Sequence, residues 1–336
     1  MMRAGIVICL LLGLGAIGCG EARLRLDAAG SSFIDPLMQE WASIYQKTKG
    51  VTLNYQGKGS GAGIKMLTAK EVDFGCSDAP LNEEQLQTAR QSNGEMIHVP
   101  LAMGAVVLAY NLDGVPELTL DGPTLIGIFT GKITKWNDAS IVKLNPKIQL
   151  PEEKITVAYR SDASGTSFIF TDYLSSIDKE AWTPGKGTAP KFETGSGHKG
   201  NAGVAGAVKA TKGSIGYVEL IYAIKNEIPY ARVINARGKA IKPDLKSVEA
   251  AAATVQVPED LRYSIVNAPG EEAYPIAGTV WALVYVKQPA AKAKLVKDFL
   301  WWATHEGQEM LEALHYARLP ESLVRKIEPK LEQIKG

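Results

Sequence analysis

The chain has few cysteines and few histidines, and both shortages exclude classes of protein. Its 336 residues include three cysteines and four histidines. Cys9 lies in an apolar N-terminal segment and Cys19 directly follows that segment, so only Cys76 remains for a folded body. A single body cysteine excludes an internal disulfide, so the apolar core must stabilise the fold. The scattered histidines lack the spacing of a metal site, and we expect neither a metal nor a cofactor.

The chain also lacks an excess of charge of either sign. Its 37 lysines and arginines stand against 36 aspartates and glutamates, a formal net charge of +1. Nucleic-acid binders need a basic surface, so this balance argues against DNA or RNA as a partner. A small anion is not excluded, because backbone dipoles attract an anion without any net charge.

The apolar run at the N-terminus is shorter than the stretch of apolar residues that a helix usually needs to cross a bilayer. Residues 1–18 place Arg3 before an apolar core that ends in small residues, which is typical of an export signal. The run from Ala16 to Cys19 resembles a bacterial lipoprotein processing site, in which Cys19 would become the lipidated first residue. A plain secretory signal cleaved nearby is the alternative. Both interpretations export the protein, to the periplasm or the cell surface.

Apolar strands and amphipathic helices alternate along the rest of the chain. Two alternating segments, 23–27 and 51–55, flank a helical pattern for which Asp35 would be the cap and Pro36 the first helical residue. Further strands are expected at 105–110, 155–159, 214–218 and 280–286, and helices at 166–176, 202–211 and 289–303. This order predicts an α/β protein, and the length favours two domains. Because no low-complexity linker separates them, we expect the chain to cross between the domains more than once.

Four short stretches combine small residues and hydroxyl side chains between a strand and a helix. They are 30–33 (GSSF), 57–63 (GKGSGAG), 77–80 (SDAP) and 164–167 (SGTS). The first N–H groups of a helix have no partner within the helix and carry partial positive charge, so such stretches suit an oxyanion. Helix capping alone explains any one of them, whereas four in one chain favour a site for a tetrahedral oxyanion.

Two carboxylates near these stretches bear on the kind of anion. Asp162 could orient Arg160 so that its guanidinium presents donors to an oxyanion, and a surface ion pair is the alternative. Asp78 would repel an anion unless the ligand carries a proton, as phosphate does at neutral pH and sulfate does not. By accepting a hydrogen bond from that proton, Asp78 would reject analogues that lack it. A turn or cap role for Asp78 is the alternative.

Several longer stretches resemble the phosphate-binding proteins of bacterial high-affinity phosphate ABC transporters. The matching stretches cover nearly the whole mature chain and read AAGSSFIDP, NYQGKGSGAG, VDFGCSDAPL, LTLDGPTLIGIFTGKITKWND, RSDASGTSFIFTDYL, GSGHKGNAGVAGAV, GSIGYVE and YARLP. The resemblance implies a type II periplasmic-binding-protein fold, in which two α/β lobes joined by two crossover segments close on phosphate in the cleft between them. We expect one lobe at residues 24–103 with 272–336 and the other at 104–271.

The resemblance also implies ligands from both lobes. By position in these motifs, the phosphate ligands would be Ser32, Phe33 (through its backbone N–H), Ser60, Asp78, Arg160, Ser164, Gly165 and Thr166, with Asp162 orienting Arg160. The protein is then expected to be a monomer, with no catalytic residues, that delivers phosphate to a membrane ABC permease. Another protonated oxyanion, arsenate, is an alternative ligand. A phosphoester hydrolase on the same scaffold is an alternative function, but it needs a nucleophile with a base, or a metal cluster.

Some positions depart from the family pattern. Ser32 replaces a frequent threonine and keeps the hydroxyl, and Ala163 stands where glycine is common. Cys76 stands where alanine is usual, and we expect a packed, inert thiol there. Asp35 adds a negative charge near a helix end that should attract the ligand, so we expect it to face solvent or weaken binding.

Overall fold

A computed structural model of the chain describes residues 24–336. The principal strands are β1 (Arg25–Gly30), β2 (Thr52–Gln56), β3 (Phe74–Ser77), β4 (Met96–Tyr110), β6 (Thr156–Arg160), β7 (Ser196–His198), β8 (Ser214–Glu219) and β11 (Ala277–Tyr285). Three short strands are β5 (Thr119–Leu120), β9 (Arg232–Ile234) and β10 (Ala240–Ile241). The helices are α1 (Asp35–Lys49), α2 (Ser60–Thr68), α3 (Glu83–Asn93), α4 (Gly122–Phe129), α5 (Ala139–Leu144), α6 (Gly165–Ile177), α7 (Gly200–Ala210), α8 (Leu220–Lys225), α9 (Leu245–Ala252), α10 (Ala290–Thr304) and α11 (Glu321–Leu331).

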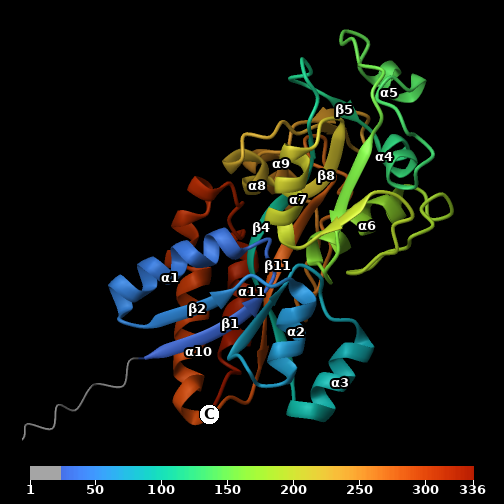
Figure 1. Cartoon of the computed structure of the whole chain (residues 1–336). Helices are drawn as coiled ribbons and strands as arrows, with labels where there is room; N and C mark the ends of the chain where they lie inside the picture. Colours follow the sequence, from blue (N-terminus) through green and yellow to red (C-terminus); the bar gives the residue numbers. More distant parts are fainter. Residues whose placement is uncertain (1–23) are drawn as a thin grey trace, which may run out of the picture.

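The principal strands form one sheet in the order β2-β1-β3-β11-β4-β8-β6-β7, and β10, β9 and β5 form a small second sheet. We call β1–β3 with α1–α3, α10 and α11 the first lobe, and β5–β10 with α4–α9 the second lobe. Figure 1 shows the two groups of helices at opposite ends of the molecule, with β4 and β11 between them. The predicted α/β fold of two lobes is confirmed, while the lobe boundaries expected at 103/104 and 271/272 stay a prediction.

Strand β4 connects the two lobes and is longer than the sequence predicts. It pairs antiparallel with β11 as far as Ala105 and then with β8 from Val106 onward. The expected strand at 105–110 covers only its end, because Pro100 interrupts the pattern of strand-forming residues. In the structure Pro100 lies opposite Trp281, where the register between β4 and β11 shifts. A proline lacks the N–H that the ladder needs, so this irregularity is where a sheet tolerates it.

Helix α1 follows the first of the four glycine- and hydroxyl-rich stretches. The side chains that it buries in the first lobe are Leu37, Met38, Trp41 and Tyr45. The expected cap is wrong: Ile34 is the N-cap residue and makes no side-chain cap bond, while Asp35 is already helical. The Asp35 carboxylate accepts a hydrogen bond from Gln39 Nε2 at 2.9 Å, and its position in the first turn suits the helix dipole. Asp35 is partly exposed, and its effect on ligand binding stays a prediction.

The prediction for Cys76 can be compared with the structure, whereas the prediction for the N-terminal leader cannot. Cys76 is a free cysteine and is fully buried at the end of β3. Burial raises the pKa of its thiol far above the usual value, which agrees with the packed, inert thiol that we expect there. Cys19 and the predicted signal at 1–18 lie outside the described residues. Within residues 24–336, no helix combines the length and the apolar character needed to cross a bilayer.

Candidate functional site: a polar cage between the lobes

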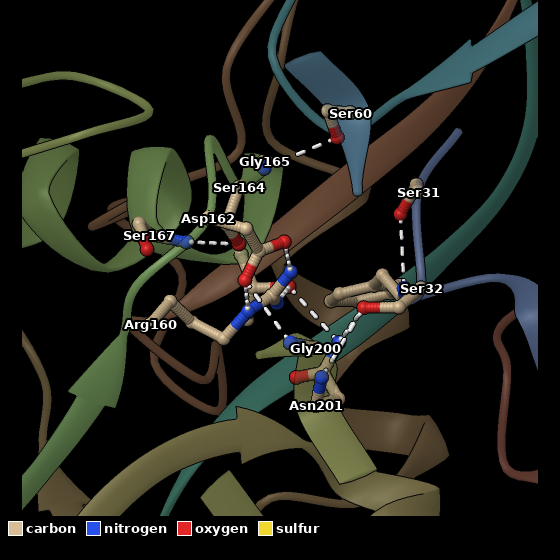
Figure 2. A network of polar contacts seen from close by, with 12 residues as sticks. Ser31, Ser32, Ser60, Arg160, Asp162, Ser164, Gly165, Ser167, Gly200 and Asn201 are labelled. Carbon is tan, nitrogen blue, oxygen red and sulfur yellow. Dashed lines mark hydrogen bonds and ion pairs between the residues drawn. The ribbon is translucent and has the colours of Figure 1, made fainter. Parts of the chain in front are cut away.

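The four glycine- and hydroxyl-rich stretches occupy the loops after β1, β2, β3 and β6, each of which leads into a helix. This confirms their predicted place between strand and helix. Strands β1, β2 and β3 are parallel to one another, so their loops gather at one edge of the first lobe. Figure 2 shows residues of the β1, β2 and β6 loops converging on one polar centre. Ligands of open α/β sheets bind at such carboxyl-terminal edges.

Ser60 and Gly165 join the two lobes directly. The Ser60 hydroxyl oxygen accepts hydrogen bonds from the backbone N–H of Gly165, at 3.1 Å, and from that of Asp78, at 3.3 Å. A Cβ at Gly165 would lie 2.6 Å from the Ser60 hydroxyl oxygen and 2.6 Å from the Asp78 side chain. Only glycine therefore allows the start of α6 to approach the first lobe so closely.

Arg160 is held at the edge of this contact by a carboxylate. Its Nε and Nη2 donate to the two oxygens of Asp162, at 2.8 and 2.6 Å, and its Nη1 donates to the Thr166 hydroxyl at 3.3 Å. Burial acts to raise the pKa of Asp162, but the hydrogen bonds and the charge of Arg160 outweigh burial and hold that pKa below its usual value. The Arg160 side chain is only 1% exposed, so the alternative of a surface ion pair is wrong.

Asp78 is a buried carboxylate with spare acceptor capacity. Its Oδ2 accepts a long hydrogen bond of 3.5 Å from the Thr166 hydroxyl, and its Oδ1 has no partner among residues 24–336. Burial raises the pKa of Asp78 to about 7, although the nearby Ser31 hydroxyl, the charge of Arg160 and the Thr166 hydroxyl act to lower it. The cap of α3 is Asn82, so the cap role considered for Asp78 is wrong. An unpaired buried acceptor is costly, and a ligand hydroxyl would satisfy it.

Three other predicted residues have bonds of their own. Ser32 Oγ accepts from the side chain and the backbone of Asn201, at 3.1 and 3.2 Å. The Phe33 N–H donates to Ser31 Oγ at 2.9 Å, so binding a ligand through this N–H requires that bond to break. Ser164 is the N-cap residue of α6, and its Oγ accepts from the Ser167 N–H, which leaves its own proton to donate.

Asn201 is the central residue that the sequence reasoning missed. It lies in the first turn of α7, is fully buried, and contacts both Ser32 and Thr166. The matched stretch GSGHKGNAGVAGAV contained a signal, because glycines again separate a strand from a helix there. The adjacent Gly200 N–H donates to Asp162 Oδ1 at 3.0 Å, which ties α7 to the Arg160 pair.

The arrangement suits a small anion. The first turns of α1, α2, α6 and α7 lie at this polar centre, and each helix start carries partial positive charge. We call the residues that meet there the cage: Ser32, Ser60, Asp78, Arg160, Thr166 and Asn201. Arg160 adds one full positive charge and the hydroxyls add neutral donors. Within residues 24–336, no three histidine, cysteine, aspartate or glutamate side chains come together as a metal site would require.

Comparisons with known proteins agree with this geometry. Residues 19–306 match the model of the PBP superfamily domain. The chain is 42% identical over 312 residues to the phosphate-binding protein PstS of Xylella fastidiosa (strain 9a5c), with 91% of this chain and 84% of that protein covered. The chain belongs to the PstS family of phosphate-binding proteins.

Other members of the PstS family and more distant structures extend the likeness. The phosphate-binding protein PstS of Haemophilus influenzae is 38% identical over 325 residues, with 94% of this chain and 95% of that protein covered. A solved high affinity periplasmic phosphate-binding protein, bound with phosphate, superposes with a TM-score of 0.75 at 22% identity, over 91% of this chain and 93% of that chain. The PstS resemblance stated from sequence is confirmed, and the structural likeness confirms the periplasmic-binding fold.

Proposed function

We propose that this protein binds inorganic phosphate between its lobes and delivers it to a membrane ABC permease. The observation that carries the proposal is the pairing of a buried guanidinium, on Arg160, with a buried carboxylate, on Asp78, whose Oδ1 has no partner among residues 24–336. The guanidinium attracts an anion, and the carboxylate needs a hydrogen-bond donor on that anion. Phosphate meets both demands, and the names of the curated relatives agree.

The ligand is proposed to hold the lobes together. Ser32, Ser60 and Asp78 belong to the first lobe, whereas Arg160 and Thr166 belong to the second. Contacts to groups from both lobes are complete only when the lobes meet, so phosphate binds the closed state more tightly and shifts the population toward it. Direct bonds support closure: the Gly61 N–H donates to the Ala163 carbonyl at 3.0 Å, and the Tyr222 hydroxyl donates to the Ser32 carbonyl at 2.7 Å. The permease would then recognise the closed shape.

Asp78 is proposed to read the protonation of the anion. When ionised, it accepts a hydrogen bond from phosphate, which keeps a proton at neutral and mildly alkaline pH. Sulfate has no proton to donate, so a sulfate oxygen and the ionised Asp78 carboxylate would meet as two acceptors that both carry negative charge. Sites built around a ligand hydroxyl reject analogues that lack it by about 10⁴–10⁵-fold. Arsenate keeps a proton and would donate the same hydrogen bond to Asp78.

The remaining parts of the proposal concern the location and state of the chain. Export to the periplasm or cell surface agrees with the N-terminal pattern and with the periplasmic relative. Lipidation at Cys19 would anchor the protein to a membrane near its permease. We propose a monomer, because the ligand groups all come from one chain.

The rival function is phosphoester hydrolysis. The structure does bring one serine to one histidine: Ser196 Oγ lies 2.8 Å from His198 Nε2 on β7. Both residues lie on an edge strand, with Ser196 exposed, rather than in the cage. A chromogenic phosphoester assay on the protein and on Ser196→Ala tests this rival, and turnover that the substitution abolishes would support hydrolysis.

Calorimetric titration of phosphate-free protein tests the proposal. We expect one phosphate per chain, arsenate bound with similar affinity, and sulfate weaker by about 10⁴-fold at pH 9, where Asp78 is ionised. Equal affinity for sulfate would contradict the proton-reading role of Asp78. A failure of both phosphate and arsenate to bind would overturn the function.

A further inference from the structure

The Asn201 side chain has only one orientation that satisfies its surroundings. Its Oδ1 accepts a hydrogen bond of 3.0 Å from the backbone N–H of Glu219, a group that can only donate. The opposite end of the amide, Nδ2, therefore faces Ser32 Oγ at 3.1 Å and Thr166 Oγ1 at 3.2 Å. Figure 2 shows Asn201 beside Ser32 at the start of α7. The network itself thus assigns the oxygen and nitrogen of this amide.

A count of lone pairs shows what Asn201 does to the two hydroxyls. A hydroxyl oxygen has two acceptor sites and one proton. Ser32 Oγ accepts from both the N–H and the Nδ2 of Asn201. Thr166 Oγ1 accepts from Asn201 Nδ2 and from Arg160 Nη1, the latter at 3.3 Å. With both acceptor sites filled, each hydroxyl can only donate, and its proton points away from Asn201. The Thr166 proton makes a long contact of 3.5 Å with Asp78 Oδ2, which a bound anion would replace.

We propose that Asn201 is a positioning residue that fixes the hydroxyls of Ser32 and Thr166 as donors toward the anion between the lobes. This inference rests on the proposed phosphate function and extends it to the protons of the cage. Free hydroxyls rotate, and an anion must select the donating orientation of each. Asn201 makes that selection before the ligand arrives, which lowers the entropy lost on binding.

The position of the amide is set by β8, which pairs with β4, the strand that connects the lobes. Glu219 ends β8, and it lies opposite Val106 of β4 in the sheet. The N–H that holds Asn201 Oδ1 therefore belongs to the sheet rather than to a loop. Ser32 comes from the first lobe and Thr166 from the second, so one amide coordinates a donor from each lobe.

A simple packing role for Asn201 makes a different prediction. Aspartate has nearly the same shape, and its Oδ1 can still accept from Glu219. Its second oxygen would accept from Ser32 and Thr166, so both hydroxyls would turn their protons away from the ligand. If Asn201 only fills space, Asn201→Asp should bind phosphate better than Asn201→Ala. If Asn201 orients the hydroxyls, the aspartate should be the worse of the two.

The first experiment measures phosphate affinity of Asn201→Ala and Asn201→Asp by calorimetry, with thermal unfolding as the check on folding. Two neutral hydrogen bonds are involved, so we expect Asn201→Ala to weaken binding about 10- to 100-fold. We expect Asn201→Asp to be weaker than Asn201→Ala by a further tenfold or more. The matched control is Asn235→Ala, a buried asparagine that bonds to carbonyls at 271 and 273, whose phosphate affinity should stay within about twofold. Tighter binding by Asn201→Asp than by Asn201→Ala would overturn the inference.

A second experiment separates orientation from the added charge of aspartate. Asn201→Ala is combined with Ser32→Ala and Thr166→Val, which remove both hydroxyls, and affinity is read from the phosphate-induced shift in Tm if calorimetry is too weak. Where the hydroxyls are absent, losing Asn201 should change affinity by less than about threefold. An equal loss in both backgrounds would show that Asn201 does not act through them. If the wild-type protein itself gives no phosphate signal, the proposed function fails first.

Discussion

Replacing Arg160 by alanine should weaken phosphate binding by about 2–5 kcal/mol. The guanidinium is 1% exposed and has three donors committed to Asp162 and Thr166, so it is both desolvated and fixed in direction. Truncating one partner of a buried, hydrogen-bonded charge pair typically costs at least this much. At 1.4 kcal/mol per factor of ten, the loss corresponds to about 30- to 4,000-fold in Kd.

The same substitution should also destabilise the ligand-free protein, and the two effects can be separated. The Asp162 side chain is 15% exposed beside Arg160, and without that arginine its carboxylate keeps a hydrogen bond from the Gly200 N–H but no cation. Breaking a buried pair in this way costs about 3–5 kcal/mol of unfolding free energy. The double variant Arg160→Ala/Asp162→Ala removes the orphaned charge. It should recover part of the stability and none of the phosphate affinity.

Calorimetry with phosphate and thermal unfolding without it provide the two readouts. A folded Arg160→Ala variant that loses less than about 1 kcal/mol of binding free energy would show that the guanidinium does not contact the ligand. Recovery of wild-type affinity in the double variant would show that Arg160 acts on binding only through folding. Either result would remove the cationic part of the cage.

Three further predictions concern Asp78 and the approach of the lobes. Asp78→Asn keeps the volume but replaces the unpartnered acceptor with an amide. Calorimetry at pH 9 should therefore show the preference for phosphate over sulfate falling from about 10⁴-fold to below about 100-fold. An unchanged preference would refute the proton-reading role. Because burial raises the pKa of Asp78 to about 7, its carboxyl is mostly protonated below that pH and can donate to sulfate. Wild-type sulfate affinity should therefore rise about tenfold per pH unit as pH falls from about 9 to 7 and then level off, whereas Asp78→Asn should show no such slope. A Cβ at Gly165 would lie 2.6 Å from Ser60 Oγ, so Gly165→Ala should keep each lobe folded but hold the two lobes apart. We expect phosphate affinity at least about 100-fold weaker and an open shape by X-ray scattering. A closed shape would contradict this prediction.

The sequence predicted helices and strands well where the hydrophobic pattern was uninterrupted. The helix expected at 166–176 is α6, Gly165–Ile177, and the one expected at 289–303 is α10, Ala290–Thr304. The pattern failed for β4, because Pro100 and Gly104 are read as strand breakers. A Cβ at Gly104 would lie 2.8 Å from the Phe33 ring, so this glycine lets the loop after β1 pack on the crossover strand. The need for glycine here comes from a contact between segments far apart in the sequence, so the residues around Gly104 do not indicate it.

The candidate site was predictable to the extent that it consists of loops with their own pattern. Ser60, Arg160 and Gly165 lie together because each is at or just beyond the carboxyl end of a strand, which is what the sequence indicated. Asn201 escaped prediction because its partners are 35 and 169 residues away along the chain. The bond from the Phe33 N–H to a neighbouring hydroxyl also could not be foreseen, since it depends on the rotamer of one serine.

The amount of phosphate that co-purifies with the protein tests the central claim most directly. Protein purified without added phosphate would be denatured, and the released phosphate counted per chain by a colorimetric assay, with Arg160→Ala treated in parallel. A cage that desolvates and encloses the anion predicts close to one phosphate per wild-type chain and almost none for Arg160→Ala. Equal amounts from both proteins, or none from a wild-type protein that also fails to take up added phosphate, would contradict the account.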